Sequence, residues 1–117
     1  MKILITGVAG LIGSNFSEHL LKTIDGIEIV GIDNLSGGYQ SNIHKNIKIY
    51  KNDLLEFDEI ENIFKKHTFD YIYHFAAYAA EGLSPFIRKF NFVLRITKIF
   101  LYRFPVYIFR SPIISLP

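Results

Sequence analysis

The stretch that decides the fold lies at the start of the chain, where residues 2–13 read KILITGVAGLIG. Its apolar run, residues 3–5, is unbroken, which is typical of a strand covered on both faces. Gly7, Gly10 and Gly13 then follow at intervals of three, and apolar residues at helical spacing come next. A strand, a glycine-rich turn and a helix in this order predict a loop that holds a phosphate group at the helix N-terminus.

Each of the three glycines has its own physical reason. Gly7 permits a tight turn out of the strand, Gly10 lets a pyrophosphate approach the backbone, and Gly13 lets the helix pack close to the strand. Backbone N–H groups and the helix dipole then face the anion. A βα turn that merely favours glycine is the alternative interpretation. The residues expected at the anion are Gly7, Ala9, Gly10, Leu11, Ile12 and Gly13.

An aspartate follows at the distance that a dinucleotide site requires. Asp33 lies 20 residues after Gly13, at the end of a second apolar run. A carboxylate there accepts hydrogen bonds from both hydroxyls of an adenosine ribose and repels a 2′-phosphate. No arginine follows nearby, so the sequence favours NAD over NADP. An ordinary strand-ending aspartate is the alternative.

The remaining elements alternate along the chain. The expected strands are 2–6, 27–32, 47–50 and 70–75, and the expected helices are 11–24, 57–66 and 84–90. A polar loop is expected over 34–45. Strands that alternate with helices predict a parallel sheet with helices on its faces, which is an α/β fold.

Four motifs together resemble a known family. They are TGVAGLIG at 6–13, GIDNLS at 31–36, NDL at 52–54 and HFAAY at 74–78. In this order and at this spacing they resemble the extended short-chain dehydrogenase/reductase family, and within it the NAD-dependent nucleotide-sugar epimerases and dehydratases. The resemblance covers about residues 1–92.

The resemblance implies an incomplete Rossmann-type doubly wound parallel sheet with strand order 3-2-1-4, NAD as the cofactor, and Asp53 near the adenine amino group. A nucleotide-sugar substrate is implied only for a full-length relative, for which a homodimer is left open. The further residues that it implies at the cofactor are Asp33, Asn34, Leu35, Ser36, Asp53, Leu54, Phe75, Ala76, Ala77 and Tyr78.

The catalytic pair of that family is not found in these 117 residues. Its members carry a Tyr-x-x-x-Lys pair, in which the tyrosine is the general acid/base and the lysine lowers its pKa. None of the seven tyrosines here has a lysine four residues on. We therefore assign no catalytic residue and expect the chain to be catalytically inactive by itself.

The composition changes near residue 92. Residues 92–117 contain no Gly, Asp or Glu and four basic residues. The expected domains are thus an incomplete NAD(P)-binding domain over 1–91 and a basic apolar tail over 92–117. A frame-shifted or truncated product and a natural short protein both explain the tail. Within this tail, residues 106–111 faintly resemble the strand that members of the family have after the helix following the fourth strand. Such a strand would be the fifth of the sheet.

Charge and composition exclude several classes of protein. A formal net charge of +2 is too small to indicate binding to nucleic acid. With no cysteine and no metal-ligand spacing among the four histidines, no metal site is expected. No signal peptide or membrane span is recognised, which predicts a cytoplasmic location. A non-catalytic dinucleotide-binding sensor, and a fragment that acts on a membrane or partner through its tail, remain alternative functions.

Overall fold

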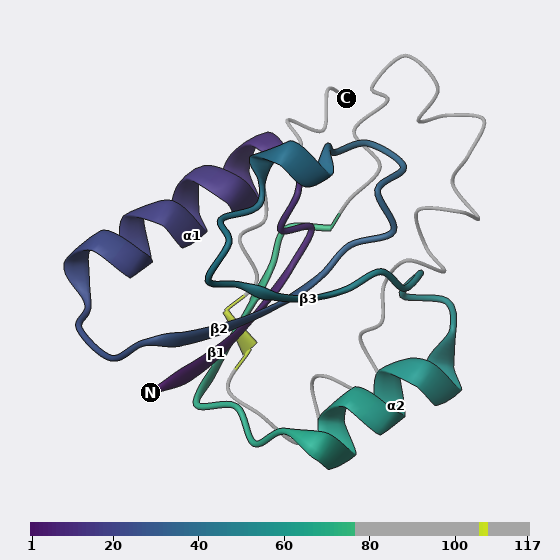
Figure 1. The fold of residues 1–117 in the computed structure, drawn as a ribbon. Coiled ribbons are helices and arrows are strands. Elements are labelled where there is room, and N and C mark those ends of the chain that lie inside the picture. The colour runs from purple at the N-terminus through teal and green to yellow at the C-terminus, as the bar shows by residue number, and fades with distance from the viewer. Residues whose placement is uncertain (77–105, 108–117) are drawn as a thin grey trace, which may run out of the picture.

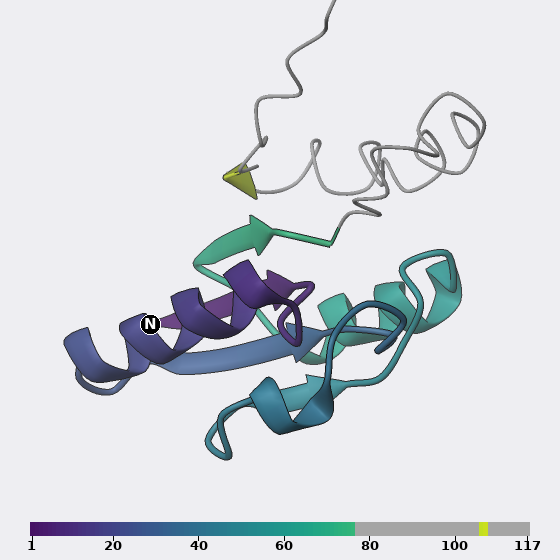
Figure 2. The same cartoon turned by 90° about the horizontal axis from the view of Figure 1, so that it is seen from above.

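A parallel sheet of five strands forms the centre of the computed structural model, which describes residues 1–76 and 106–107. The strands are β1 (Lys2–Thr6), β2 (Glu28–Ile32), β3 (Lys48–Tyr50), β4 (Tyr71–His74) and β5 (Val106–Tyr107). They lie in the order β3-β2-β1-β4-β5, which Figure 2 shows from above. The predicted order 3-2-1-4 is therefore confirmed. The fifth strand that the sequence left open is found beside β4, in parallel.

Two helices cover opposite faces of the sheet (Figure 1): α1 (Leu11–Thr23) and α2 (Phe57–Lys66). Successive side chains of a strand point to opposite faces, so β1 contributes to two cores. Ile3 and Ile5 pack in the cluster that contains Leu20 of α1. Leu4 packs in the other, which contains Ile60 and Ile63 of α2. Burial on both faces explains the unbroken apolar run of β1.

The observed elements differ from the expected ones mainly at their ends. The helix expected over 57–66 is found with those bounds, whereas β4 is shorter than the expected 70–75. Within the loop expected over 34–45, the chain forms a short 3₁₀ helix, η1 (Gln40–Asn42). The helix expected over 84–90 lies outside the described residues.

The strand register brings the ends of three strands to one edge of the sheet. Thr6 at the end of β1 pairs with Ile32 of β2 and with His74 of β4. The segments that follow these residues therefore leave the sheet side by side. This is the carboxyl edge of a parallel sheet, where open α/β folds bind their ligands.

Candidate nucleotide-binding site

Two of the three glycines are required by the packing of the chain itself. Gly7 has φ +71°, and a Cβ on it would lie 2.7 Å from the backbone N of Ala76. A Cβ on Gly13 would lie 2.1 Å from the carbonyl oxygen of Gly7. Real Cβ atoms essentially never come closer than 3.0 Å. The tight turn expected at Gly7 and the close helix packing expected at Gly13 are thus both found.

Gly10 differs from the other two glycines. Its φ is −75°, which any residue adopts, and a Cβ on it would meet only the Gly7 carbonyl oxygen, at 3.4 Å. No group of the described chain therefore demands glycine at this position. The close approach of a pyrophosphate, which the sequence predicts here, is compatible with this backbone.

The start of α1 offers a row of backbone donors. None of the described residues accepts a hydrogen bond from the N–H groups of Leu11, Ile12 or Gly13, and no side chain caps the helix. These groups carry the positive end of the helix dipole. The side chains of Leu11 and Ile12 are themselves exposed. An anion near Gly10 would meet these donors.

Asp33 lies beside this loop and already holds two backbone groups. Its Oδ2 accepts from Ala9 N–H at 2.9 Å, and its Oδ1 accepts from Leu35 N–H at 2.8 Å. The second bond supports Leu35 in the left-handed region, with φ 61°. A carboxylate has about four acceptor positions, so Asp33 retains acceptor positions beyond the two that Ala9 and Leu35 use. Because Ala9 N–H is engaged, the donors left for an anion are those at the start of α1.

The segments after β2 and β3 are joined by side chains. Asn34 Nδ2 donates to Asp53 Oδ2 at 3.1 Å, and Ser36 N–H and Oγ both donate to Asn34 Oδ1. Leu54 is buried in the core on the α2 side. Only the backbone of Leu54 is therefore left to meet a nucleotide. Asn34 and Asp53 present polar atoms at the same edge as Asp33.

The segment after β4 packs against the glycine loop and the start of the chain's first helix. Phe75 packs edge-on against Phe16 of α1, with ring centroids 5.4 Å apart. The backbone N–H of Ala76 donates to Thr6 Oγ1 at 3.4 Å. Ala77 and Tyr78, which the sequence also places at the cofactor, lie outside the described residues.

Sequence reasoning missed four residues of this site. Thr6 Oγ1 lies 2.6 Å from His74 Nδ1, and this contact joins the ends of β1 and β4. Burial lowers the pKa of His74 below its ordinary value, which favours the neutral ring. Asn42 and Gly38 contact Ala9 from the loop after β2. Thr6 and His74 lie inside the motifs at 6–13 and 74–78. For Asn42 and Gly38, the sequence indicates only that they belong to a polar loop.

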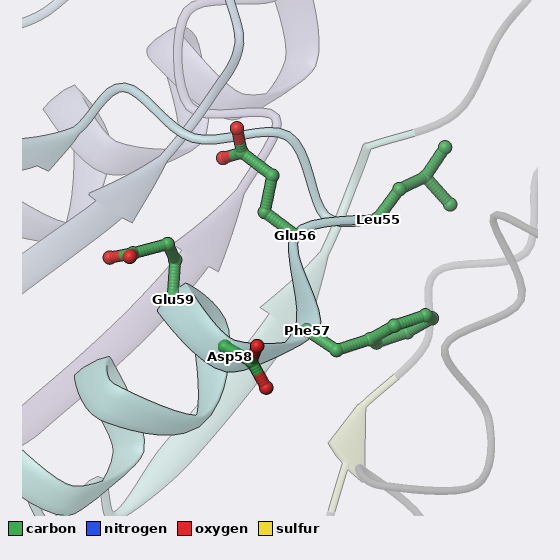
Figure 3. A pocket seen from close by; sticks show the side chains of 5 residues that line it. All are labelled: Leu55, Glu56, Phe57, Asp58 and Glu59. Atoms are coloured by element: carbon green, nitrogen blue, oxygen red, sulfur yellow. The ribbon is translucent and has the colours of Figure 1, made fainter.

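A separate hollow lies at the start of α2. It has a volume of about 410 Å³ and is lined by residues 55–59 (Figure 3). Leu55 and Phe57 point to one side of this segment, and Glu56 and Glu59 point to the other. No residue of the glycine loop lines it. With three carboxylates along its wall, it does not suit a pyrophosphate.

Two other features are not found in the described part of the chain. No helix within it is long and apolar enough to cross a bilayer. Nor do residues 1–76 and 106–107 gather three histidine or acidic side chains around a possible metal position.

A parallel sheet of order 3-2-1-4, with a glycine loop and an aspartate at its carboxyl edge, defines the Rossmann class of α/β domains. The comparison with known families is more specific, because residues 3–92 match the model of the NAD dependent epimerase/dehydratase family. The chain belongs to this family, and the resemblance seen in its sequence is confirmed.

Relatives and solved structures agree with this assignment. The chain is 41% identical over 85 residues to a dTDP-D-glucose 4,6-dehydratase of Dictyostelium discoideum, covering 66% of this chain and 19% of the relative. It is 34% identical over 84 residues to a UDP-glucose 4-epimerase of Streptomyces lividans, covering 71% and 25%. The structure of the Thermus thermophilus UDP-glucose 4-epimerase in complex with NAD superposes with a TM-score of 0.74 at 31% identity, over 82% of this chain and 30% of that one.

The match is confined to one part of each relative. The chain spans 19% and 25% of the length of the two curated relatives named above. Family members and structural neighbours bind NAD: the Thermus thermophilus enzyme and the Bordetella bronchiseptica enzyme WbmH were both solved with it.

Proposed function

We propose that this chain binds NAD as the N-terminal, cofactor-binding part of a nucleotide-sugar epimerase or dehydratase. The observation that carries the proposal is Gly10. The chain's own packing explains Gly7 and Gly13, whereas a Cβ on Gly10 would make only one ordinary contact, at 3.4 Å from the Gly7 carbonyl oxygen. The backbone donors of residues 11–13 begin immediately after it. A pyrophosphate over Gly10 would use both features.

The rest of the nucleotide follows the carboxyl edge of the sheet. Asp33 would accept hydrogen bonds from the adenosine ribose with the acceptor positions that Ala9 and Leu35 do not use. Adenine would lie toward Asp53, whose carboxylate is oriented by Asn34. The same negative charge at Asp33 would repel a 2′-phosphate, which supports NAD over NADP. Bound NAD supplies a hydride acceptor; this chain's residues bind and orient it.

We further propose that these 117 residues do not turn over a sugar nucleotide by themselves. No tyrosine of the chain has a lysine four residues on, so the acid/base group that moves the hydroxyl proton is lacking. Such a group typically contributes about 10²–10⁴-fold in rate. The same observation favours a second candidate, a non-catalytic dinucleotide-binding module.

Calorimetric titration of the 117-residue chain tests the binding proposal. NAD should bind, and NADP should bind more weakly. Absence of NAD binding by a chain whose circular dichroism shows a folded α/β domain would refute it.

A second assay tests the proposed lack of turnover. The chain is incubated with NAD and a panel of UDP-, dTDP- and GDP-sugars, and products are separated by chromatography. We expect no epimerised or dehydrated sugar above a control without protein. Product above that control would show that another group performs the proton transfer.

A further inference from the structure

We infer that Asn42 is a positioning residue for the nucleotide site: with Asp33, it holds the glycine loop at Ala9 in its binding shape before a nucleotide arrives. That the loop binds a nucleotide rests on the proposed function. The contact between Asn42 and Ala9 is present in the chain without nucleotide.

Ala9 is the point at which the glycine loop is held. The residue is fully buried, and buried backbone N–H and C=O groups need hydrogen-bond partners. Its N–H donates to Asp33 Oδ2 at 2.9 Å, and its carbonyl oxygen accepts from Asn42 Nδ2 at 3.0 Å. Both partners are side chains of the segment 33–42, one at each end of it. This segment therefore completes the hydrogen bonding of the glycine loop.

Close packing of the same segment on Ala9 is an independent observation. A Cβ on Gly38 would lie 2.5 Å from both the carbonyl carbon and the carbonyl oxygen of Ala9. Only glycine permits this approach, since a larger residue would push the segment away from the loop. Contact at Gly38 and hydrogen bonding at Asn42 thus act on the same peptide group.

Asn42 reaches Ala9 from a fixed position. It is the last residue of η1, which Figure 1 shows beside the start of α1, and its N–H donates to the Tyr39 carbonyl at 3.0 Å. The next residue, Ile43, packs against the core on the α1 side of the sheet. Asn42 itself is exposed. Its replacement should therefore leave both hydrophobic cores intact.

Fixing the Ala9 carbonyl also fixes the peptide that leads into Gly10. The N–H of Gly10 donates to the Gly7 carbonyl at 3.2 Å, and the donors of residues 11–13 follow directly. A loop that already has this shape does not have to be ordered when the ligand binds. The conformational entropy lost on binding is therefore smaller, and the affinity is higher. Asn42 would thus act on the nucleotide through Ala9 and not by contact.

Amide hydrogen exchange, measured by NMR on the nucleotide-free 117-residue chain, tests the inference. Asn42→Ala removes the donor, and Asn42→Asp keeps the side-chain shape but places an acceptor against the Ala9 carbonyl. Both should speed exchange at Ala9 and Gly10 by at least about fivefold. Exchange at core amides such as Ile63 and Ile72 should be unchanged. Asn62→Ala, at an exposed position of α2, is the matched control and should change neither.

Two further measurements separate this inference from the proposed function. NAD affinity, measured by calorimetry, should fall about fivefold in Asn42→Ala, or about 1 kcal/mol. Gly38→Ala should speed exchange at Ala9 by steric displacement of the segment. Unchanged exchange at Ala9 and Gly10 in both Asn42 variants would overturn the inference, as would an equal rise at all amides. If the wild-type chain binds no NAD, the proposed function fails, while the exchange data still decide on Asn42.

Discussion

The same substitution at two glycines of one loop should have different effects: Gly13→Ala should lower stability, and Gly10→Ala should weaken NAD binding. In Gly13→Ala the new Cβ would lie 2.1 Å from the Gly7 carbonyl oxygen and 2.9 Å from the Cα of Val8. To reach the 3.0 Å limit of real contacts, α1 must move away from β1 by about 0.9 Å. Both neighbours are backbone, so no flexible side chain can yield. Overpacking of this kind costs typically about 1–3 kcal/mol, and we expect about 3 kcal/mol here.

Gly10→Ala should leave stability nearly unchanged. The backbone at Gly10 has φ −75° and ψ 171°, which alanine adopts without strain. Replacement of glycine at a compatible position gains roughly 0.4–1 kcal/mol through the unfolded state, and the 3.4 Å contact with Gly7 offsets part of this. We expect a change of less than about 0.5 kcal/mol. NAD binding should nevertheless weaken at least about tenfold, because the methyl group occupies the space proposed for the pyrophosphate.

Urea unfolding followed by circular dichroism measures the first effect, and calorimetric titration with NAD measures the second. Each variant is the control for the other, since both add one methyl group to the same loop. If Gly10→Ala bound NAD as tightly as the wild type, the pyrophosphate would not lie over Gly10. If Gly13→Ala unfolded at the wild-type urea concentration, the close approach of α1 to Gly7 would be wrong.

Two other predictions concern Asp33 and His74. Asp33→Ala removes the acceptor of Ala9 N–H and Leu35 N–H. The free energy of unfolding, measured with urea, should therefore fall by about 2–4 kcal/mol. In calorimetry, the variant should bind NAD more weakly than the wild type and discriminate less against NADP. If the variant and the wild type bound NAD with equal affinity, Asp33 would not hold the ribose. Burial lowers the pKa of His74 from 6.5, so the unfolded chain binds a proton more readily than the folded one. The free energy of unfolding should therefore be fully retained above about pH 6.5 and fall as the pH drops toward the folded pKa. His74→Asn should reduce this slope between about pH 7 and 5, and an unchanged slope would show that His74 does not cause it.

The sequence by itself determined the class of fold, the family and the place of the glycine loop. The unbroken run of residues 3–5 predicts a strand buried on both faces, and the three spaced glycines predict the turn into α1. Alternation of strands and helices predicts a parallel sheet, whose strand order the family motifs specify. These signals are local, because they depend on side-chain periodicity and on backbone conformations that only certain residues adopt.

Only the tertiary structure decided how the site is held together. Asp33 lies 24 residues from Ala9, and Asn42 lies 33 residues from it. Thr6 and His74 are 68 residues apart in the chain. No local pattern predicts which polar side chain of one loop meets a buried backbone group of another loop, because the sheet register and the path of the chain decide it. For the same reason Gly13 and Gly10, equivalent in the sequence motif, differ in the structure. A Cβ on Gly13 would lie 2.1 Å from the Gly7 carbonyl oxygen, whereas a Cβ on Gly10 would lie at an ordinary 3.4 Å from it.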